Sequence, residues 1–223
     1  MSVRVDHLVV AAATLAEGVA WCESSLGVTP GPGGQHALMG THNRLFKIAT
    51  SAYPNAYFEI IAIDPDAPPP SRKRWFGLDD PIQQALLREQ GPQLVHFVAR
   101  STMLDMHRWG LITVGQKPGD PVAASRPTPT GLLSWQILLR DDGGMGCDGA
   151  LPTLLQWQGP HPADAMPESG VTLQSLALCG VPAPARDVLR LRGVQVTAEP
   201  GTPIQAVLAT PLGDVVLTSP PGR

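Results

Sequence analysis

Three side chains that can hold charge or move protons lie inside apolar stretches of this sequence. His7 lies within residues 3–10, Glu59 within 56–63 and His96 within 94–99. An unpaired carboxylate facing a core is costly, so Glu59 needs a polar cavity, a metal or another cation, unless it lies on the solvated face of a sheet. A single strand histidine is as often a hydrogen-bonded core residue as a functional one, but a second one, His96, favours a functional site.

Four more side chains are candidates for substrate contact. His42 follows a glycine-rich turn, where it either meets a ligand and shuttles protons near neutral pH or lies on the surface. Arg126 precedes a stretch rich in Pro and Gly and either binds a carboxylate in a bidentate manner or is solvated. Trp135 and Trp157 either form the floor of a pocket or fill the core.

The elements that must position these residues follow a simple order. Residues 3–10 are β-branched and partly alternating, which predicts a strand with Val5 and His7 on the same face as Val9. A helix over 15–26 has a capping-box pattern at its start and a glycine after its end. Further strands are expected near 35–40, at 43–48 and at 56–63, so the order is strand, helix, strand, strand, strand.

A similar order then begins again. After a Pro-rich stretch and a helix at 81–89, we expect a strand with His96, a short helix and later strands; a third, partial copy has no histidine in its first strand. The predicted units, packed as one compact structure, are 1–66 (first βαβββ module), 67–92 (Pro-rich linker with a helix), 93–160 (second βαβββ module) and 170–219 (partial third βαββ module).

Four short sequences carry a resemblance to a known family. They are DHLV at 6–9, GTHN at 40–43, YFEII at 57–61 and LLQW at 154–157. With the repeated βαβββ order, they resemble the glyoxalase-like domain of the vicinal oxygen chelate (glyoxalase/bleomycin resistance/extradiol dioxygenase) superfamily, closely over 3–158 and loosely beyond. The resemblance implies an α+β fold in which tandem βαβββ modules form open, cupped mixed sheets, with a partial third module.

The resemblance also implies a metal site. Carried onto this chain, the ligands are His7, Glu59, His96 and, by alignment of the two fourth strands, Gln156. Two imidazoles and a carboxylate suit Fe, Mn, Ni or Zn. An amide at Gln156 departs from the carboxylate usual in the family, and this side chain is instead expected in solvent if its strand faces the other way.

We therefore expect a divalent-metal-dependent lyase, isomerase or dioxygenase acting on a small oxygenated substrate, with Glu59 and His42 as catalytic groups and with His42, Arg126, Trp135 and Trp157 at the substrate. The alternative is a metal-free protein of the same fold that binds or sequesters a small molecule, which the Gln156 departure favours. A third possibility is a scaffold whose third unit serves assembly, for example of a homodimer.

Composition excludes several other classes. Only 16% of residues are charged, the net charge is −3 and the basic residues are scattered, which argues against nucleic-acid binding. Apolar runs fall short of the roughly 20 residues that cross a bilayer and no leader precedes them, so we expect a cytoplasmic protein without membrane contact. Three cysteines without paired spacing argue against disulfides. Without a phosphate-binding glycine motif, no nucleotide cofactor is expected.

Overall fold

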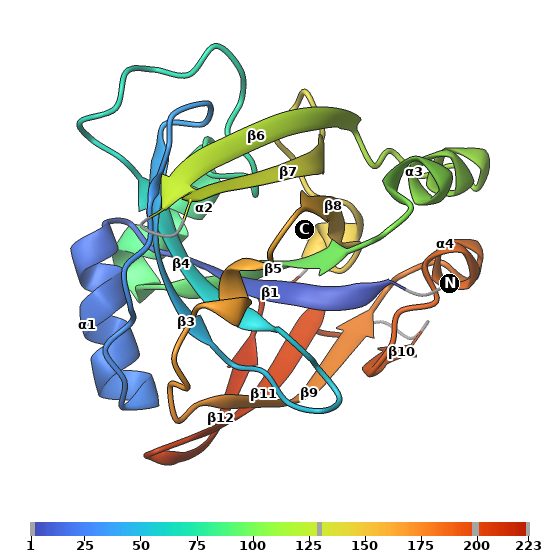
Figure 1. Cartoon of the computed structure of the whole chain (residues 1–223). Helices are drawn as coiled ribbons and strands as arrows, with labels where there is room; N and C mark the ends of the chain where they lie inside the picture. The colour runs from blue at the N-terminus through green and yellow to red at the C-terminus, as the bar shows by residue number, and fades with distance from the viewer. Residues whose placement is uncertain (1–2, 129–130, 198–200, 222–223) are drawn as a thin grey trace.

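The computed structural model describes residues 3–128, 131–197 and 201–221 (Figure 1). The first module consists of β1 (Arg4–Ala11), α1 (Leu15–Leu26), β2 (Gln35–His36), β3 (Thr41–Lys47) and β4 (Tyr57–Ile63), and α2 (Pro81–Gln90) follows it. The second consists of β5 (Gln93–Arg100), α3 (Leu104–Thr113), β6 (Asp120–Thr128), β7 (Gly131–Leu139) and β8 (Thr153–Gln158), with two short 3₁₀ helices at Cys147–Gly149 and Pro162–Asp164. The third unit consists of β9 (Thr172–Cys179), α4 (Ala183–Leu189), β10 (Val194–Thr197), β11 (Ile204–Thr210) and β12 (Gly213–Thr218).

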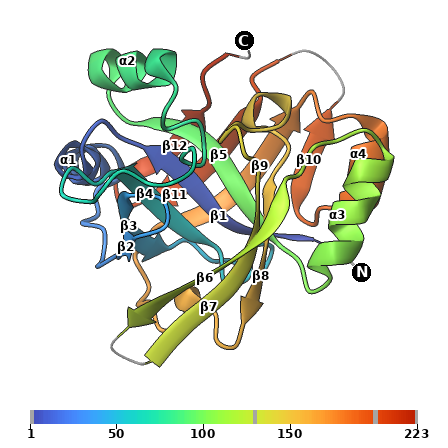
Figure 2. The ribbon, with the colours of Figure 1, turned by 90° about the horizontal axis from the view of Figure 1, so that it is seen from above.

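The first two modules form one eight-stranded sheet in the order β2-β3-β4-β1-β5-β8-β7-β6. In each module the first strand runs parallel to the last, and the modules join where β1 pairs antiparallel with β5. From above, the sheet curves around the β1–β5 seam (Figure 2). This confirms the expected tandem modules in a cupped mixed sheet, and we call the concave face of this sheet the cup.

Strand β6 is the strand of the second βαβββ module that was not located in the sequence, and two prolines interrupt it. Strand β6 lies at the edge of the sheet, with a neighbouring strand on one side only. Pro121 and Pro127 are tolerated there because proline has no N–H to donate, and on the open side of an edge strand no partner strand needs one. Its alternate residues Val122, Ala124 and Arg126 are partly buried, whereas their neighbours are exposed. The segment that carries Arg126 is therefore a strand of the cup.

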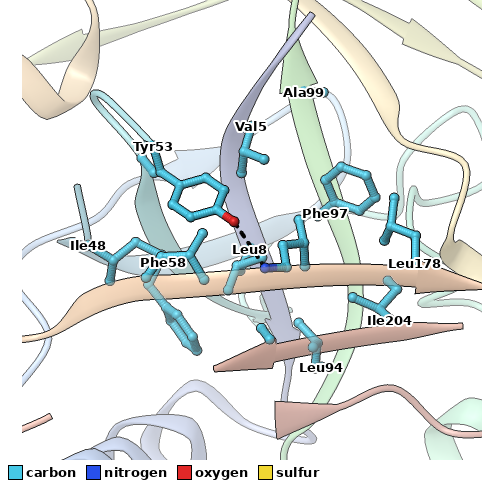
Figure 3. Close-up of a cluster of buried hydrophobic side chains, with 14 of the residues drawn as sticks. Val5, Leu8, Ile48, Tyr53, Phe58, Leu94, Phe97, Ala99, Leu178 and Ile204 are labelled. Atoms are coloured by element: carbon cyan, nitrogen blue, oxygen red, sulfur yellow. Dashed lines mark hydrogen bonds between the residues drawn. The ribbon is translucent and has the colours of Figure 1, made fainter. Parts of the chain in front are cut away.

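The third unit is a separate four-stranded sheet in the order β10-β9-β11-β12. Here β11, not the last strand, lies beside β9, so the strand order differs from that of the two modules. This sheet packs behind the β1–β5 seam, where Leu8 and Phe97 meet Leu178 and Ile204 in the main hydrophobic core (Figure 3). The predicted boundaries of the units stay predictions.

Tyr53 ties the two sheets together. Its hydroxyl accepts a hydrogen bond from Leu176 N on β9 (3.1 Å; dashed line in Figure 3). The same hydroxyl donates to the carbonyl of Gly193. Because both the ring and the hydroxyl are used, this residue fixes the third unit against the convex side of the large sheet. The cup is left on the other side.

No helix in the described part of the chain is long and apolar enough to cross a membrane. Cys22, Cys147 and Cys179 are free thiols. The cytoplasmic location and the homodimer stay predictions.

Candidate functional site

Strands of both modules enclose a cavity of about 40 Å³ in the cup. We call it the inner cavity. Polar and aromatic side chains line it together, which is typical of a small-molecule site. They include His36, Asn43, Tyr57 and Glu59 from the first module next to His7, and Arg126, Trp135 and Trp157 from the second, with Trp75 and Phe76 from the connection before α2.

His7 and Glu59 face each other in the lining of this cavity. His7 Nε2 lies 3.4 Å from Glu59 Oε2, and both side chains are buried. Asn43 donates from Nδ2 to the other oxygen of Glu59 (2.6 Å), and its own Oδ1 accepts from the backbone of Gly34 (2.8 Å). The carboxylate is thus held on one side by an amide and on the other by an imidazole.

A β-bulge in β1 positions His7. Val5 pairs with Ala99 and His7 pairs with Val98, so Asp6 is the extra residue. The bulge puts Val5 in the core behind the sheet, while Val9 lies in the cup. The expectation that Val5 shares a face with His7 and Val9 is therefore wrong, because alternation breaks at a bulge.

The bulged Asp6 is fully buried and collects three donors. Its Oδ1 accepts from His7 Nδ1 (2.8 Å), and its Oδ2 accepts from Trp157 Nε1 (2.9 Å) and His161 Nε2 (3.0 Å). The His7 ring also stacks on Tyr57, with 4.5 Å between ring centroids. These contacts fix the His7 ring so that Nε2 faces Glu59.

The charges of this cluster follow from its contacts. Burial alone would lower the pKa of His7, but hydrogen bonds and charge from Asp6 and Glu59 raise it to about 9. Burial alone would raise the pKa of Glu59, but His7, His36 and Asn43 lower it. Near neutral pH the cavity therefore contains an imidazolium beside a carboxylate.

A second histidine of the cavity is His36 on β2, not the expected His42. The His36 ring contacts Trp75 edge-on, and its Nδ1 lies 3.0 Å from Thr41 Oγ1. Burial lowers its pKa to about 4, so it is neutral at pH 7. His42 does not line the inner cavity, since Asn43 and Leu45 are the residues of β3 that line it. His42 Nδ1 lies 3.9 Å from Asp64 Oδ1. The structure therefore places His36, and not the expected His42, in the lining of the inner cavity, and the expected role of His42 stays a prediction.

Comparisons with known proteins agree with this architecture. A family model described as a glyoxalase-like domain matches residues 5–191. The chain belongs to the glyoxalase-like domain family. This confirms the resemblance proposed from the sequence.

One solved structure shares the fold of this glyoxalase-like protein. A hypothetical protein from Staphylococcus aureus has a TM-score of 0.59 at 12% identity over 97% of this chain and 88% of the other, a likeness that shows the fold alone. Methylmalonyl-CoA epimerase from Mycobacterium tuberculosis has a TM-score of 0.41 at 16% identity over 72% of this chain and 91% of the other. None of the curated proteins compared with the chain matches it.

Two expected ligands of the glyoxalase-like site lie elsewhere. His96 is fully buried; its Nδ1 donates to the carbonyl of Gly149 (2.8 Å) and its Nε2 accepts from Thr153 N (3.0 Å). Gln156 lies between Leu155 and Trp157, which line the inner cavity, and therefore on the other face of β8. Its Oε1 accepts a hydrogen bond from Leu104 N at the start of α3 (3.1 Å). Both side chains are structural, and neither is brought to His7 and Glu59.

The remaining donors do not fit the metal that the family resemblance implies. No three His, Cys, Asp or Glu side chains are grouped as metal ligands within residues 3–128, 131–197 and 201–221. His7 Nδ1 is hydrogen-bonded to Asp6 and His7 Nε2 faces Glu59, and in the described part of the chain no further donor completes a metal site with them. The structure therefore does not bring the four expected ligands His7, Glu59, His96 and Gln156 together, and a metal at this site stays a prediction.

The raised pKa of His7 makes stability depend on pH. Its folded pKa of about 9 exceeds the ordinary value of 6.5, so its contribution is complete below pH 6.5 and is lost as pH rises through about 9. At 1.36 kcal/mol per pKa unit, we expect the free energy of unfolding to fall by about 3 kcal/mol between pH 6.5 and 9. Urea titrations at several pH values measure this. In a His7→Gln variant the free energy of unfolding should lack this part of the decrease. If it falls equally steeply with pH in both proteins, His7 is not the group responsible.

Proposed function

We propose that this glyoxalase-like protein is an isomerase that moves a proton between carbon and oxygen of a small carbonyl compound. The observation that carries the proposal is the pair of buried, oppositely charged groups, Glu59 and His7, facing one small cavity at 3.4 Å. Acid–base catalysis at carbon needs such a pair, with one group that accepts a proton and one that donates it.

In the proposed reaction, Glu59 removes a proton from the carbon next to the carbonyl. The electron pair of that C–H bond forms a C=C bond, and the carbonyl oxygen takes a proton from His7 Nε2, which gives the enol. Glu59 then passes its proton to His7, and the original charges are restored. No oxidant or other reactant is needed.

The surroundings support these two roles. Asn43 holds Glu59 in place, and Asp6 keeps His7 charged and oriented. A fixed imidazolium beside the carbonyl oxygen stabilises the negative charge that develops there, and it does so strongly because water is largely excluded. The proposal contains no metal step, because the donors around His7 and Glu59 do not fit one.

Hydrogen exchange in D₂O tests the proposal. We expect the protein to accelerate exchange of the C3 hydrogens of 4-methyl-2-oxopentanoate or of its methyl ester by at least about 10²-fold, followed by NMR, with no loss in the presence of EDTA. Binding of these compounds without exchange would reject the isomerase and favour the alternative expected from the sequence, a metal-free binding protein.

A further inference from the structure

Arg126 brings a third charge to the inner cavity. It lies on β6 and lines the cavity together with His7 and Glu59. Its guanidinium passes so close to Gly34 that a Cβ built there would lie 2.4 Å from Nη1. The side chain therefore reaches from the edge strand of the second module to the β2–β3 hairpin of the first.

The charge of Arg126 has no acidic partner. Arg74 pairs with Asp79 at 2.7 Å, whereas no carboxylate lies within 4.0 Å of Arg126 in the described ranges. Arg4 and Arg186 are likewise partly buried without a carboxylate partner, but neither lines the inner cavity. A half-buried guanidinium beside a cavity, with its donors unused, is suited to a planar anion such as a carboxylate.

The charges around the cavity leave room for one more anion. Among the residues that line the inner cavity, Glu59 is negative, whereas His7 and Arg126 are positive. The cluster therefore has one positive charge in excess, and a monocarboxylate would balance it. A neutral ligand would leave Arg126 desolvated without compensation.

A larger pocket lies directly beside the inner cavity. We call it the outer pocket; its volume is about 240 Å³, and it shares the walls His36, Trp75, Trp135 and Ile137 with the inner cavity. The rest of its lining is mainly apolar, with Leu38, Met39, Ala124 and Leu139. Since a cavity of about 150 Å³ holds a benzene ring, this pocket can take a branched aliphatic chain or an aromatic ring.

We propose that the ligand of this site is a small monocarboxylic acid with an apolar chain. Arg126 binds the carboxylate through two parallel hydrogen bonds, and the chain occupies the outer pocket. The carboxylate thereby places the adjoining carbonyl between His7 and Glu59. The placement of the carbonyl rests on the proposed isomerase, whereas the binding of the carboxylate by Arg126 and of the chain in the outer pocket does not.

Calorimetric titration with three probes tests the ligand class. We expect 4-methyl-2-oxopentanoate to bind at least tenfold more tightly than its methyl ester, which lacks the charge, and than pyruvate, which lacks the chain. Arg126→Gln should weaken binding of the acid at least tenfold and change the ester little, while Arg126→Lys gives an intermediate loss. Ala124→Phe should weaken the long acid but not pyruvate, because it fills only the outer pocket.

Arg44→Gln is the matched control, since Arg44 is an exposed arginine on the outer side of β3. Equal affinities for acid and ester, equal losses in the Arg126→Gln and Arg44→Gln variants, or no binding of the acid would each overturn the proposal. Binding of the acid through Arg126 without hydrogen exchange would reject only the isomerase. Equal exchange of acid and ester, unaffected by Arg126→Gln, would reject only the ligand class.

Discussion

Replacing Glu59 by Gln is expected to slow the hydrogen exchange catalysed by this glyoxalase-like protein by about 10²–10⁴-fold. Glutamine has the same shape and its oxygen can still accept from Asn43 Nδ2, which lies 2.6 Å from the carboxylate in the parent protein. The amide cannot take a proton from carbon, so the reaction loses its base while the cavity keeps its form. The measured quantity is the rate of deuterium incorporation at saturating 4-methyl-2-oxopentanoate.

Gln156→Ala is the matched control for this experiment. The family-based metal site makes Gln156 a ligand, whereas its side chain accepts a hydrogen bond from Leu104 N at the start of α3. We therefore expect this variant to exchange hydrogen within a few-fold of the parent rate. A loss as large as that of Glu59→Gln would restore Gln156 to the site, and an unchanged rate in Glu59→Gln would remove Glu59 as the base.

The repeated modules could be predicted because their signals are local. The helix α1 shows this: Thr14 accepts a hydrogen bond from Glu17 N at its start, and Gly27 is left-handed at its end with φ 72°. Strand and helix periodicity then repeat in the second module. The order of strands in the third sheet depends on pairing between distant segments, which no local pattern contains. The edge strand β6 pairs with the adjacent β7, but its two prolines hide the strand pattern.

The site was predicted only in part, for physical reasons. His7 and Glu59 do face each other, because a charged side chain in an apolar strand needs a buried partner. His96 has the same sequence signature, yet the carbonyl of Gly149 and the amide of Thr153 satisfy it. A histidine that binds backbone and one that faces a cavity look alike in a sequence.

Asn43 and His36 were missed although weak signals exist. Alternation along β3 puts either His42 or Asn43 in the cup, and only the pairing of Asn43 with Ile61, a residue of the core within the cup, decides between them. His36 follows the glycine-rich turn in a strand of two residues, too short for a periodic pattern. The bulge at Asp6 likewise depends on the partner strand.

Asp6 is expected to support the whole site, and Asp6→Ala should lower the free energy of unfolding by about 3–5 kcal/mol. The substitution leaves His7, Trp157 and His161 without their common acceptor in a buried position. Chemical denaturation at pH 7 measures the loss. Asp141→Ala is the control, because Asp141 is 96% exposed and its contact with Arg72 is a surface ion pair, for which about 0–1 kcal/mol is expected.

The same substitution separates structural support from chemistry. Without Asp6, one of the two carboxylates that raise the pKa of His7 is gone, so the pKa should fall from about 9, as NMR titration of the ring would show. Asp6→Asn provides the same test if the alanine variant does not fold. A pKa of His7 unchanged in both variants would mean that Glu59 alone keeps the imidazole charged, and that Asp6 contributes only to folding. A lowered pKa together with slower hydrogen exchange would mean that the bulge in β1 keeps the proton donor charged at neutral pH.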